Sequence, residues 1–360
     1  MNRQPSTAIV QVHDAGLARV LEAAMDIIAA TPGDARPARK PHVEPGSARL
    51  SNESHVEPGW CTLAVVLETA GSTYARAGGS VLFSADRHVG WLSGGCLEPE
   101  LQRRACVAAT TSRLDWLDID TRDDSALFSG SAVGCRGHQY IALVPLAAVP
   151  GCAEVFAAWL DGRGPLQLML GIDGAVRFSC ATQVAACLLA TEPPAWPAGR
   201  RQWTLEWTPP PRALLLGAGP EAAPLVAHLQ GLGWQVRVLE PRTAWRARCP
   251  VKAEDALSED VLSGTPVPDA VLVMHHNFEL DLDALVRLTT TTTPFIGLLG
   301  PTRRREDLFL LLSQPQRESL AVRLHSPVGL QLGGRGPEAI ALSIAAELQA
   351  WLHDPSLRRT

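Results

Sequence analysis

The feature that most constrains the fold is a glycine turn between an apolar strand and a helix in the second half of the chain. Residues 212–222 read Arg-Ala-Leu-Leu-Leu-Gly-Ala-Gly-Pro-Glu-Ala, which sets Gly217, Gly219 and Ala222 in the spacing of a Rossmann turn. Such glycines permit a sharp strand-to-helix turn and let a pyrophosphate approach the amide groups at the helix start. Glu240 follows the next predicted strand, where a carboxylate usually accepts the ribose hydroxyls of a dinucleotide. We therefore expect a Rossmann topology, and dinucleotide binding stays an open alternative because the fold alone does not establish it.

The pattern of predicted strands and helices divides the chain into three parts. From 206 to 360, short apolar strands alternate with helices, which indicates a doubly wound parallel sheet. Residues 60–205 contain several short strands and two helices, and the Pro- and Trp-rich stretch 191–211 is the expected connector. Residues 1–59 comprise a predicted helix and a linker rich in Pro, Gly and Ser. The sequence thus predicts an α/β protein, with an N-terminal α+β domain followed by a Rossmann-type domain.

Composition and charge limit the partners of the chain. A net charge of −5 over 360 residues gives no basic surplus, which excludes nucleic acid as the main partner. No apolar run reaches the roughly 18 residues that a membrane span needs. The N-terminus lacks the pattern of a secretion signal, so we expect a cytoplasmic protein. The eight cysteines form no Cys-x-x-Cys pair and no cluster with zinc spacing, which is typical of reduced thiols.

Two glycine-rich loops in the N-terminal domain are candidate binding elements. The first is Gly71-Ser72-Thr73-Tyr74, with Arg76 shortly after it, and the second is Ser93-Gly94-Gly95-Cys96-Leu97-Glu98 before a predicted helix. Consecutive glycines before a helix can form an anion-binding nest. Cys96 lies close to the helix start, where a thiolate is stabilised; the alternative is a small buried residue at a tight turn. Cys135, which also lies among glycines, has the same two interpretations.

Two further motifs lie where strands of the C-terminal domain end. His275-His276 follows the predicted strand 270–274, and Arg303-Arg304-Arg305 follows the strand that ends near residue 299. The carboxyl edge of such a sheet is where these folds bind ligands. The arginines could clamp a phosphate or a pterin, with at least one of the three left in solvent. Adjacent histidines cannot both face one site, so we do not expect the pair to bind a metal.

Taken together, these motifs resemble the XdhC/CoxI family, the accessory factors of molybdenum hydroxylases such as xanthine dehydrogenase. Eight segments carry the resemblance, and they occur in the family's order from about residue 60 to 350. They are Glu-Thr-Ala-Gly-Ser-Thr-Tyr (68–74), Ser-Gly-Gly-Cys-Leu-Glu (93–98), Gly-Cys-Arg-Gly (134–137), Gly-Ala-Gly (217–219), Leu-Glu-Pro-Arg (239–242), Met-His-His-Asn-Phe (274–278), Gly-Leu-Leu-Gly-Pro-Thr-Arg-Arg-Arg (297–305) and the stretch 327–347.

The resemblance implies a molybdenum cofactor chaperone rather than an enzyme. Such proteins bind the pyranopterin cofactor, as molybdopterin or its dinucleotide form, present it to a cysteine desulfurase and pass it to the apo form of a molybdenum hydroxylase. The family also implies a homodimer. Cys96 is the candidate for a contact with the molybdenum. The candidate cofactor-binding residues are Gly71, Ser72, Thr73, Arg76, Gly94, Gly95, Cys96, Glu98, Cys135, Gly217, Gly219, Glu240, Arg242, His276 and Arg303.

The sequence also departs from the family's pattern at several polar positions. Ala75 and Ser80 stand where the family often has a cation, and Pro220 stands where many members have a histidine. Proline has no amide proton to donate to a phosphate. Two alternatives therefore stay open, namely a scaffold that has lost its ligand and an NAD(P)-dependent oxidoreductase built on the Rossmann domain. Against the oxidoreductase, neither Lys40 nor Lys252 lies in a plausible Ser/Tyr-Lys site.

Overall fold

The chain divides into two units, Met1–Pro209 and Pro210–Thr360. The structure is a computed structural model, and it describes residues 9–12, 16–30, 59–121, 137–192, 200–249, 252–255 and 266–354. Most of the predicted linker (31–58) and Cys135 lie outside the described residues. Among the described residues, no helix is both long and apolar enough to cross a membrane.

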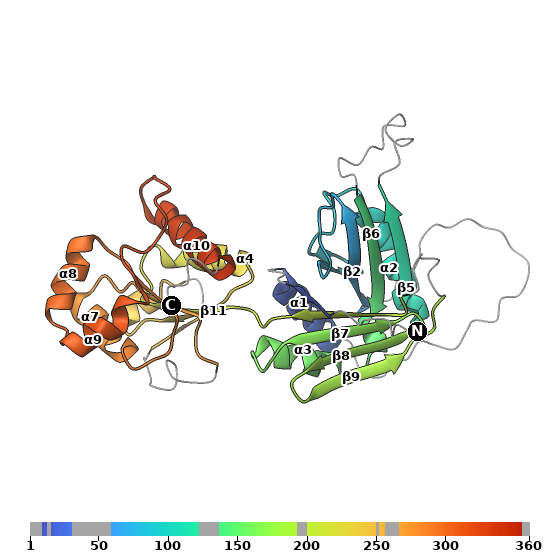
Figure 1. The fold of residues 1–360 in the computed structure, drawn as a ribbon, viewed down its shortest axis with the longest axis horizontal. Helices are drawn as coiled ribbons and strands as arrows, with labels where there is room; N and C mark the ends of the chain where they lie inside the picture. The colour runs from blue at the N-terminus through green and yellow to red at the C-terminus, as the bar shows by residue number, and fades with distance from the viewer. Residues whose placement is uncertain are drawn as a thin grey trace, which may run out of the picture. The chain divides into compact units, whose positions relative to one another are not determined.

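Among its described residues, the N-terminal unit contains two five-stranded sheets and three α-helices (Figure 1). One sheet is antiparallel throughout, and in the other only the β1–β10 pair is parallel. The first sheet has the order β1 (Ile9–Val12), β10 (Gln202–Trp207), β7 (Leu166–Gly171), β8 (Ala175–Cys180) and β9 (Gln183–Leu188). The second has the order β4 (His88–Val89), β3 (Ser80–Ser84), β2 (Cys61–Gly71), β6 (Gly137–Pro145) and β5 (Asp115–Asp120). The helices are α1 (Leu17–Ala30), α2 (Glu98–Thr111) and α3 (Cys152–Leu160), with a short 3-10 turn η2 at Leu146–Ala148.

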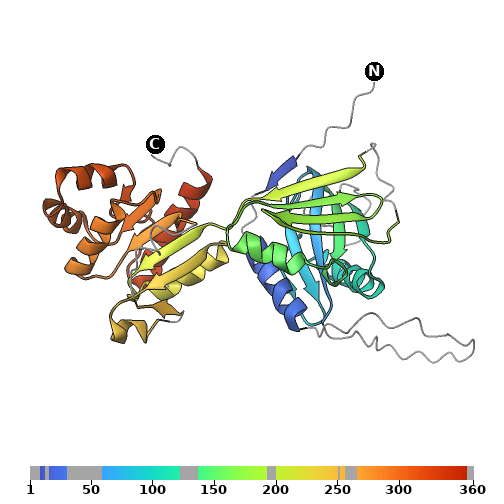
Figure 2. The same cartoon turned by 90° about the horizontal axis from the view of Figure 1, so that it is seen from below.

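Strand β2 is buried on both faces from Cys61 to Leu67, and all residues of this stretch except Thr62 are apolar. Leu63 and Val65 belong to the larger core, which also holds residues of α1, α3 and the first sheet. Ala64 and Val66 belong to a second core beneath α2. In Figure 2 α1, in dark blue, and α3, in green, lie on the same side of the unit. The double burial fixes β2 and β6 so that their ends meet, where Gly71 pairs with Gly137.

The C-terminal unit contains a six-stranded sheet in which every pair is parallel. Its order is β13 (Ala253–Glu254), β12 (Gln235–Leu239), β11 (Arg212–Leu216), β14 (Ala270–Val273), β15 (Phe295–Leu298) and β16 (Leu324–His325). In chain order these strands are arranged 3-2-1-4-5-6, the order of the dinucleotide-binding Rossmann fold. The direction of winding changes between β11 and β14, so the loops after these two strands lie at the switch point.

Helices cover both faces of this sheet (Figure 1). Residues of α4 (Ala222–Gly231) and α10 (Pro337–His353) pack with Leu215 and Leu272 on one face. Residues of α7 (Phe278–Leu288), α8 (Thr302–Leu310) and α9 (Gln314–Ala321) belong to the core of the other face. A short helix, α5 (Thr243–Arg246), follows β12. The predicted fold class is thereby confirmed, with mixed and antiparallel sheets first and a parallel Rossmann sheet second.

The structure corrects several predicted elements. The stretch 191–211, expected as a connector, contains strand β10, whose Trp203, Leu205 and Trp207 are all buried. Their period of two is the pattern of a strand, but the surrounding prolines favoured a loop in the sequence. Strands β1 and β9 were not predicted either. A strand predicted over 322–324 begins two residues later, because α9 extends to Ala321.

Candidate functional site

The loop before α2 is held in place by the side chain of Glu98. This carboxylate is buried and accepts hydrogen bonds from the backbone amides of Ser93, at 2.9 Å, and Leu92, at 3.2 Å, and from the Ser93 hydroxyl. Burial alone would raise the pKa of Glu98, but the hydrogen bonds from Ser93 and Leu92 outweigh it and hold the pKa below its usual range. Glu98, predicted as a cofactor ligand, is therefore placed as the residue that shapes the loop.

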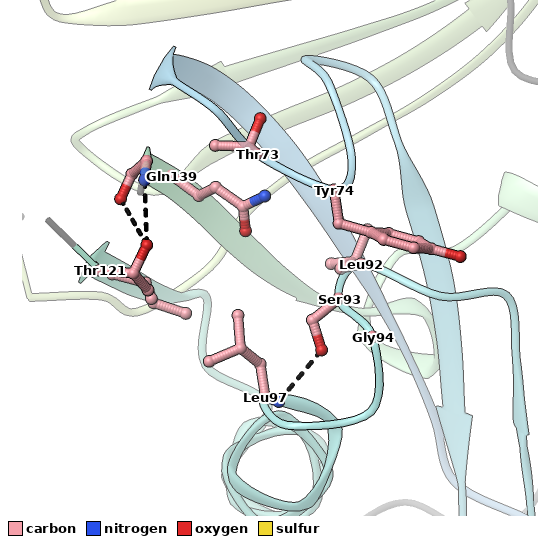
Figure 3. Close-up of a pocket in the computed structure, with 10 residues that line it drawn as sticks. Thr73, Tyr74, Leu92, Ser93, Gly94, Leu97, Thr121 and Gln139 are labelled. Carbon is pink, nitrogen blue, oxygen red and sulfur yellow. Dashed lines mark hydrogen bonds between the residues drawn. The ribbon is translucent and has the colours of Figure 1, made fainter. Parts of the chain in front are cut away.

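The Ser93 hydroxyl oxygen accepts the amide protons of the same loop. Leu97 donates its backbone N–H to it at 3.1 Å (Figure 3). The Gly95 backbone N–H also donates to it at 3.1 Å, and the Cys96 thiol lies 3.5 Å away. The sequence predicts a nest of free amides around Gly94 and Gly95. In the structure, the amides of Gly95 and Leu97 are paired with the Ser93 hydroxyl within the loop. The loop therefore presents side chains and open space, rather than those two amide donors, to a ligand.

A pocket opens between this loop, the loop after β2 and the ends of β5 and β6 (Figure 3). We call it the N-terminal pocket. Its empty volume is about 310 Å³, part of which is open to solvent. Its lining combines apolar side chains with hydroxyl and amide groups, and none of the described residues in it is charged. The lining residues are Thr73, Tyr74, Leu92, Ser93, Gly94, Leu97, Ile119, Thr121, Gly137 and Gln139.

Gln139 is the polar group of this pocket that lacks a full set of partners. It comes from β6, is 5% exposed, and its side chain points into the pocket (Figure 3). Its Nε2 donates a long hydrogen bond of 3.4 Å to the carbonyl of Ala75, and its Oε1 has no hydrogen-bond partner among the described residues. Buried polar atoms are almost always paired, so an orphaned acceptor that faces a pocket indicates a missing donor.

Gly137 has no side chain, and this allows the loop after β2 to pass close to it and form one wall of the pocket. A Cβ atom at this position would lie 2.4 Å from both the Ser72 carbonyl oxygen and the Thr73 methyl group. Thr121 holds the other side, because its hydroxyl donates to the Gly137 carbonyl at 2.8 Å and accepts the Gly137 amide proton at 3.1 Å. Gly94, by contrast, faces open space, with no atom within 4 Å of a Cβ built on it.

Only some of the cofactor-binding residues predicted in the N-terminal domain line this pocket. Thr73 and Gly94 line it, and Gly95 and Glu98 belong to the loop that bounds it. Gly71, the last residue of β2, is exposed, as are Ser72 and Arg76 on the loop after this strand. Cys96 is exposed beside the pocket rather than buried at a tight turn, which corrects the alternative interpretation of this thiol. In the described part of the chain, no three acidic, histidine or cysteine side chains are grouped as metal ligands would be.

The Rossmann turn of the C-terminal unit brings Gly217 and Gly219 to the switch point, as the sequence predicts for such a fold. Gly217 has a φ of 120°, and a Cβ there would lie 2.5 Å from the Met274 carbonyl oxygen. Only glycine therefore fits where β11 passes the end of β14. The side chains around the turn, however, are paired with one another.

Glu240 and Arg242 form a closed ion pair at the end of β12. Glu240 is fully buried, and its carboxylate accepts two guanidinium hydrogen bonds from Arg242, each at 2.8 Å. It also accepts the Ala218 and Arg242 backbone amides at 2.9 Å. Burial would raise the pKa of Glu240, but the hydrogen bonds from Arg242 and Ala218 hold it below its usual range. Both carboxylate oxygens of Glu240 are therefore paired within the chain.

The histidines and arginines at the carboxyl edge divide into paired and solvated groups. His276 has a φ of 53°, and its Nε2 lies 3.1 Å from Oε2 of Glu221. The buried His275 lies 3.0 Å from Asp281, which also accepts a hydrogen bond from Arg304. Arg303, the arginine predicted to bind a cofactor, has a side chain that is 90% exposed, and its nearest carboxylate is Asp307 on the next turn of α8.

The residues that sequence reasoning missed share one property: they act through tertiary contacts. Gln139 lies on β6 and Thr121 directly follows β5, strands whose sequences carry no motif, and the pairing of these strands brings both residues to the pocket. Glu221 was visible as part of the glycine turn, and a carboxylate at the start of a helix that should bind phosphate is a signal that was available. Asp281 and Arg304 are brought together from α7 and α8 by the fold.

Comparisons with known proteins agree with this architecture. Residues 214–348 match the XdhC Rossmann domain, and residues 58–118 match the XdhC and CoxI family. The chain is 26% identical over 307 residues to a probable xanthine dehydrogenase subunit of Bacillus subtilis (strain 168), in an alignment that covers 79% of this chain and 91% of that protein. It is 30% identical over 148 residues to the uncharacterized protein YqeB of Escherichia coli (strain K12), which covers 38% of this chain and 27% of that protein.

A solved structure shows the same fold. The crystal structure of a xanthine dehydrogenase from Bacillus halodurans superposes with a TM-score of 0.65 at 24% sequence identity. The superposition covers 84% of this chain and 96% of that one. With both family matches in their expected order along the chain, this protein belongs to the XdhC/CoxI family and carries an XdhC Rossmann domain in its C-terminal unit.

Proposed function

We propose that the protein is a chaperone that binds the molybdenum cofactor and delivers it to the apo form of a molybdenum hydroxylase of the xanthine dehydrogenase type. Membership of the XdhC/CoxI family supports this assignment. The observation that carries it is the orphaned Gln139 Oε1 in the N-terminal pocket. A cysteine desulfurase and a second copy of the chain are the further partners that we propose.

The lining of the pocket fits one part of this cofactor. A pterin ring is flat and neutral. Its amino and ring N–H groups can donate hydrogen bonds to an amide oxygen such as Gln139 Oε1. The Thr73 and Ser93 hydroxyls and the apolar Leu92 and Leu97 suit the rest of a heterocycle. The described residues that line the pocket carry no charge, which suits the neutral ring better than a phosphate. When bound, the cofactor supplies the redox-active molybdenum that the client hydroxylase uses.

In this proposal the chain's own residues bind and orient the cofactor without changing it. Gln139 would accept a hydrogen bond from the pterin edge, and the loop held by Glu98 would bound the ring. Cys96, exposed beside the pocket, is the proposed contact for the metal end. We therefore propose that the pterin lies against the buried amide of Gln139 and the metal end against the solvent-facing thiol of Cys96.

Molybdenum and pterin analysis of the purified full-length chain tests the proposal. The chain is expressed in a host that makes the cofactor, molybdenum is measured by mass spectrometry, and pterin by fluorescence after oxidation. We expect both in near-stoichiometric amounts, together with activation of an apo-hydroxylase when the loaded chain is added. Absence of both molybdenum and pterin would contradict the proposal and favour a ligand-free scaffold.

A further inference from the structure

The space that a dinucleotide would need at the Rossmann turn is filled by the chain itself. In this fold, the second glycine of the turn lacks a Cβ so that the pyrophosphate can approach the backbone. A Cβ built on Gly219 would lie 3.0 Å from Oε2 of Glu221 and 3.2 Å from the ring of His276. The open side of Gly219 therefore faces a carboxylate and an imidazole.

The carboxylate of Glu221 also lies at the start of α4, where a bound anion would otherwise lie. It is the residue directly before α4, it is buried, and its only side-chain partner in the described part of the chain is His276. The partial positive charge at the start of a helix stabilises one negative group there. Here a carboxylate of the chain takes that place, so a pyrophosphate would meet a like charge at close range.

The turn offers fewer donors than its spacing suggests. Pro220 has no amide proton, and the Ala218 amide donates to Glu240. The nearby cation, Arg242, donates two hydrogen bonds to Glu240. Among the described residues, the Ala218 amide and both carboxylate oxygens of Glu240 are therefore already paired within the chain.

We infer that the Rossmann turn of this protein excludes dinucleotides and that Glu221 is the residue that excludes them. This inference concerns the C-terminal unit alone and does not depend on the cofactor proposed for the N-terminal pocket. The inference requires that removal of the Glu221 charge allows an anion to bind at the start of α4.

Binding of NADH and of inorganic pyrophosphate to the full-length chain tests this inference. NADH is followed by its fluorescence and pyrophosphate by calorimetry, with ligand up to about 1 mM, the weak end of measurable affinities. We expect no saturable binding to the unmodified chain. Glu221→Gln keeps the shape and removes the charge, so this variant is expected to bind pyrophosphate saturably within the same concentration range. Glu221→Ala with His276→Ala, which also opens the space, is expected to bind NADH.

Matched controls separate local from general effects. Glu318→Gln removes the same charge from an exposed position on α9 and is expected to leave both ligands unbound. Thermal unfolding of each variant shows that the fold is intact. Saturable NADH binding by the unmodified chain would overturn the inference. So would folded Glu221 variants that gain affinity for neither pyrophosphate nor NADH, because Glu221 would then not be the residue that closes the turn.

Discussion

The N-terminal pocket and the Rossmann turn are both bounded by glycine loops, but they differ in how their polar groups are paired. In the pocket, the buried Gln139 Oε1 has no partner among the described residues, and Gly94 faces open space. At the turn, Glu240 is paired with Arg242, and Glu221 with His276. The turn has the more recognisable sequence, whereas the pocket is the place where a ligand would complete the hydrogen bonding. The difference teaches that a glycine motif reports backbone geometry, and that the unpaired buried group reports the site.

The largest effect that we predict concerns the geometry of the pocket. Gly137→Ala places a Cβ 2.4 Å from the Ser72 carbonyl and the Thr73 methyl group, so the loop after β2 must move. We expect a loss of about 3 kcal/mol in the free energy of unfolding, the upper end of overpacking costs. Urea unfolding measures it. Gly94→Ala is the control within the same pocket and should unfold like the unmodified chain, because its Cβ meets open space. Equal stability of the two variants would contradict the predicted close approach.

The second prediction concerns the loop that Glu98 holds. Glu98→Gln weakens charge-assisted hydrogen bonds from Ser93 and Leu92, and we expect a cost of about 2 kcal/mol near neutral pH. Since the pKa of Glu98 in the folded state lies below the usual 4.5, its carboxylate stabilises the fold above that pH. This contribution is lost as the pH falls through the lower, folded-state pKa.

The pH dependence separates this role from a purely steric one. The difference in unfolding free energy between the unmodified chain and Glu98→Gln should shrink as the pH falls below the usual carboxyl value. Denaturant unfolding at a series of pH values measures it. Glu240 has a lowered pKa as well, so its acid sensitivity should persist in the Glu98→Gln variant. A difference that is constant across the acid range would contradict the charge-assisted role of Glu98.

The third prediction has opposite signs for stability and for binding. Gln139→Leu removes the orphaned Oε1, so we expect the free energy of unfolding to rise by about 1 kcal/mol, or about 2–4 °C in Tm. Pterin content should fall at the same time, because the acceptor in the pocket is gone. Gln167→Leu, on the other sheet of the unit, is the control and should keep its pterin. A clear loss of stability in Gln139→Leu would show that the amide oxygen is satisfied in the folded protein.

The smallest effect on stability is expected for Cys96. Because this thiol is exposed, Cys96→Ala should change the free energy of unfolding by no more than about 0.5 kcal/mol. It should remove the fastest phase of thiol labelling, whereas burial raises the pKa of Cys61 and of Cys152 to about 12 and keeps both slow. We also predict weaker retention of molybdenum in this variant. Unchanged retention would exclude Cys96 as the contact for the metal.

Much of the fold could be predicted because the signals are local. The apolar strand of residues 212–216, its glycine turn and the alternation that follows define the Rossmann unit from the sequence alone. Strand β10 could not be placed, because the prolines around it compete with its alternating tryptophans. The pairing at the sites was beyond sequence reasoning, since Gln139 reaches the pocket through the β5–β6 register and Arg304 reaches Asp281 from another helix.

The most direct test of the comparison is the pterin and molybdenum content of two variants, measured side by side. Gln139→Leu alters the pocket, and Glu221→Gln alters the turn, each by one side chain of similar size. If the cofactor binds in the N-terminal pocket, Gln139→Leu should lose most of its pterin and molybdenum. Glu221→Gln should then keep the pterin and molybdenum content of the unmodified chain. The reverse result, with loss confined to Glu221→Gln, would contradict the account and place the cofactor at the Rossmann turn.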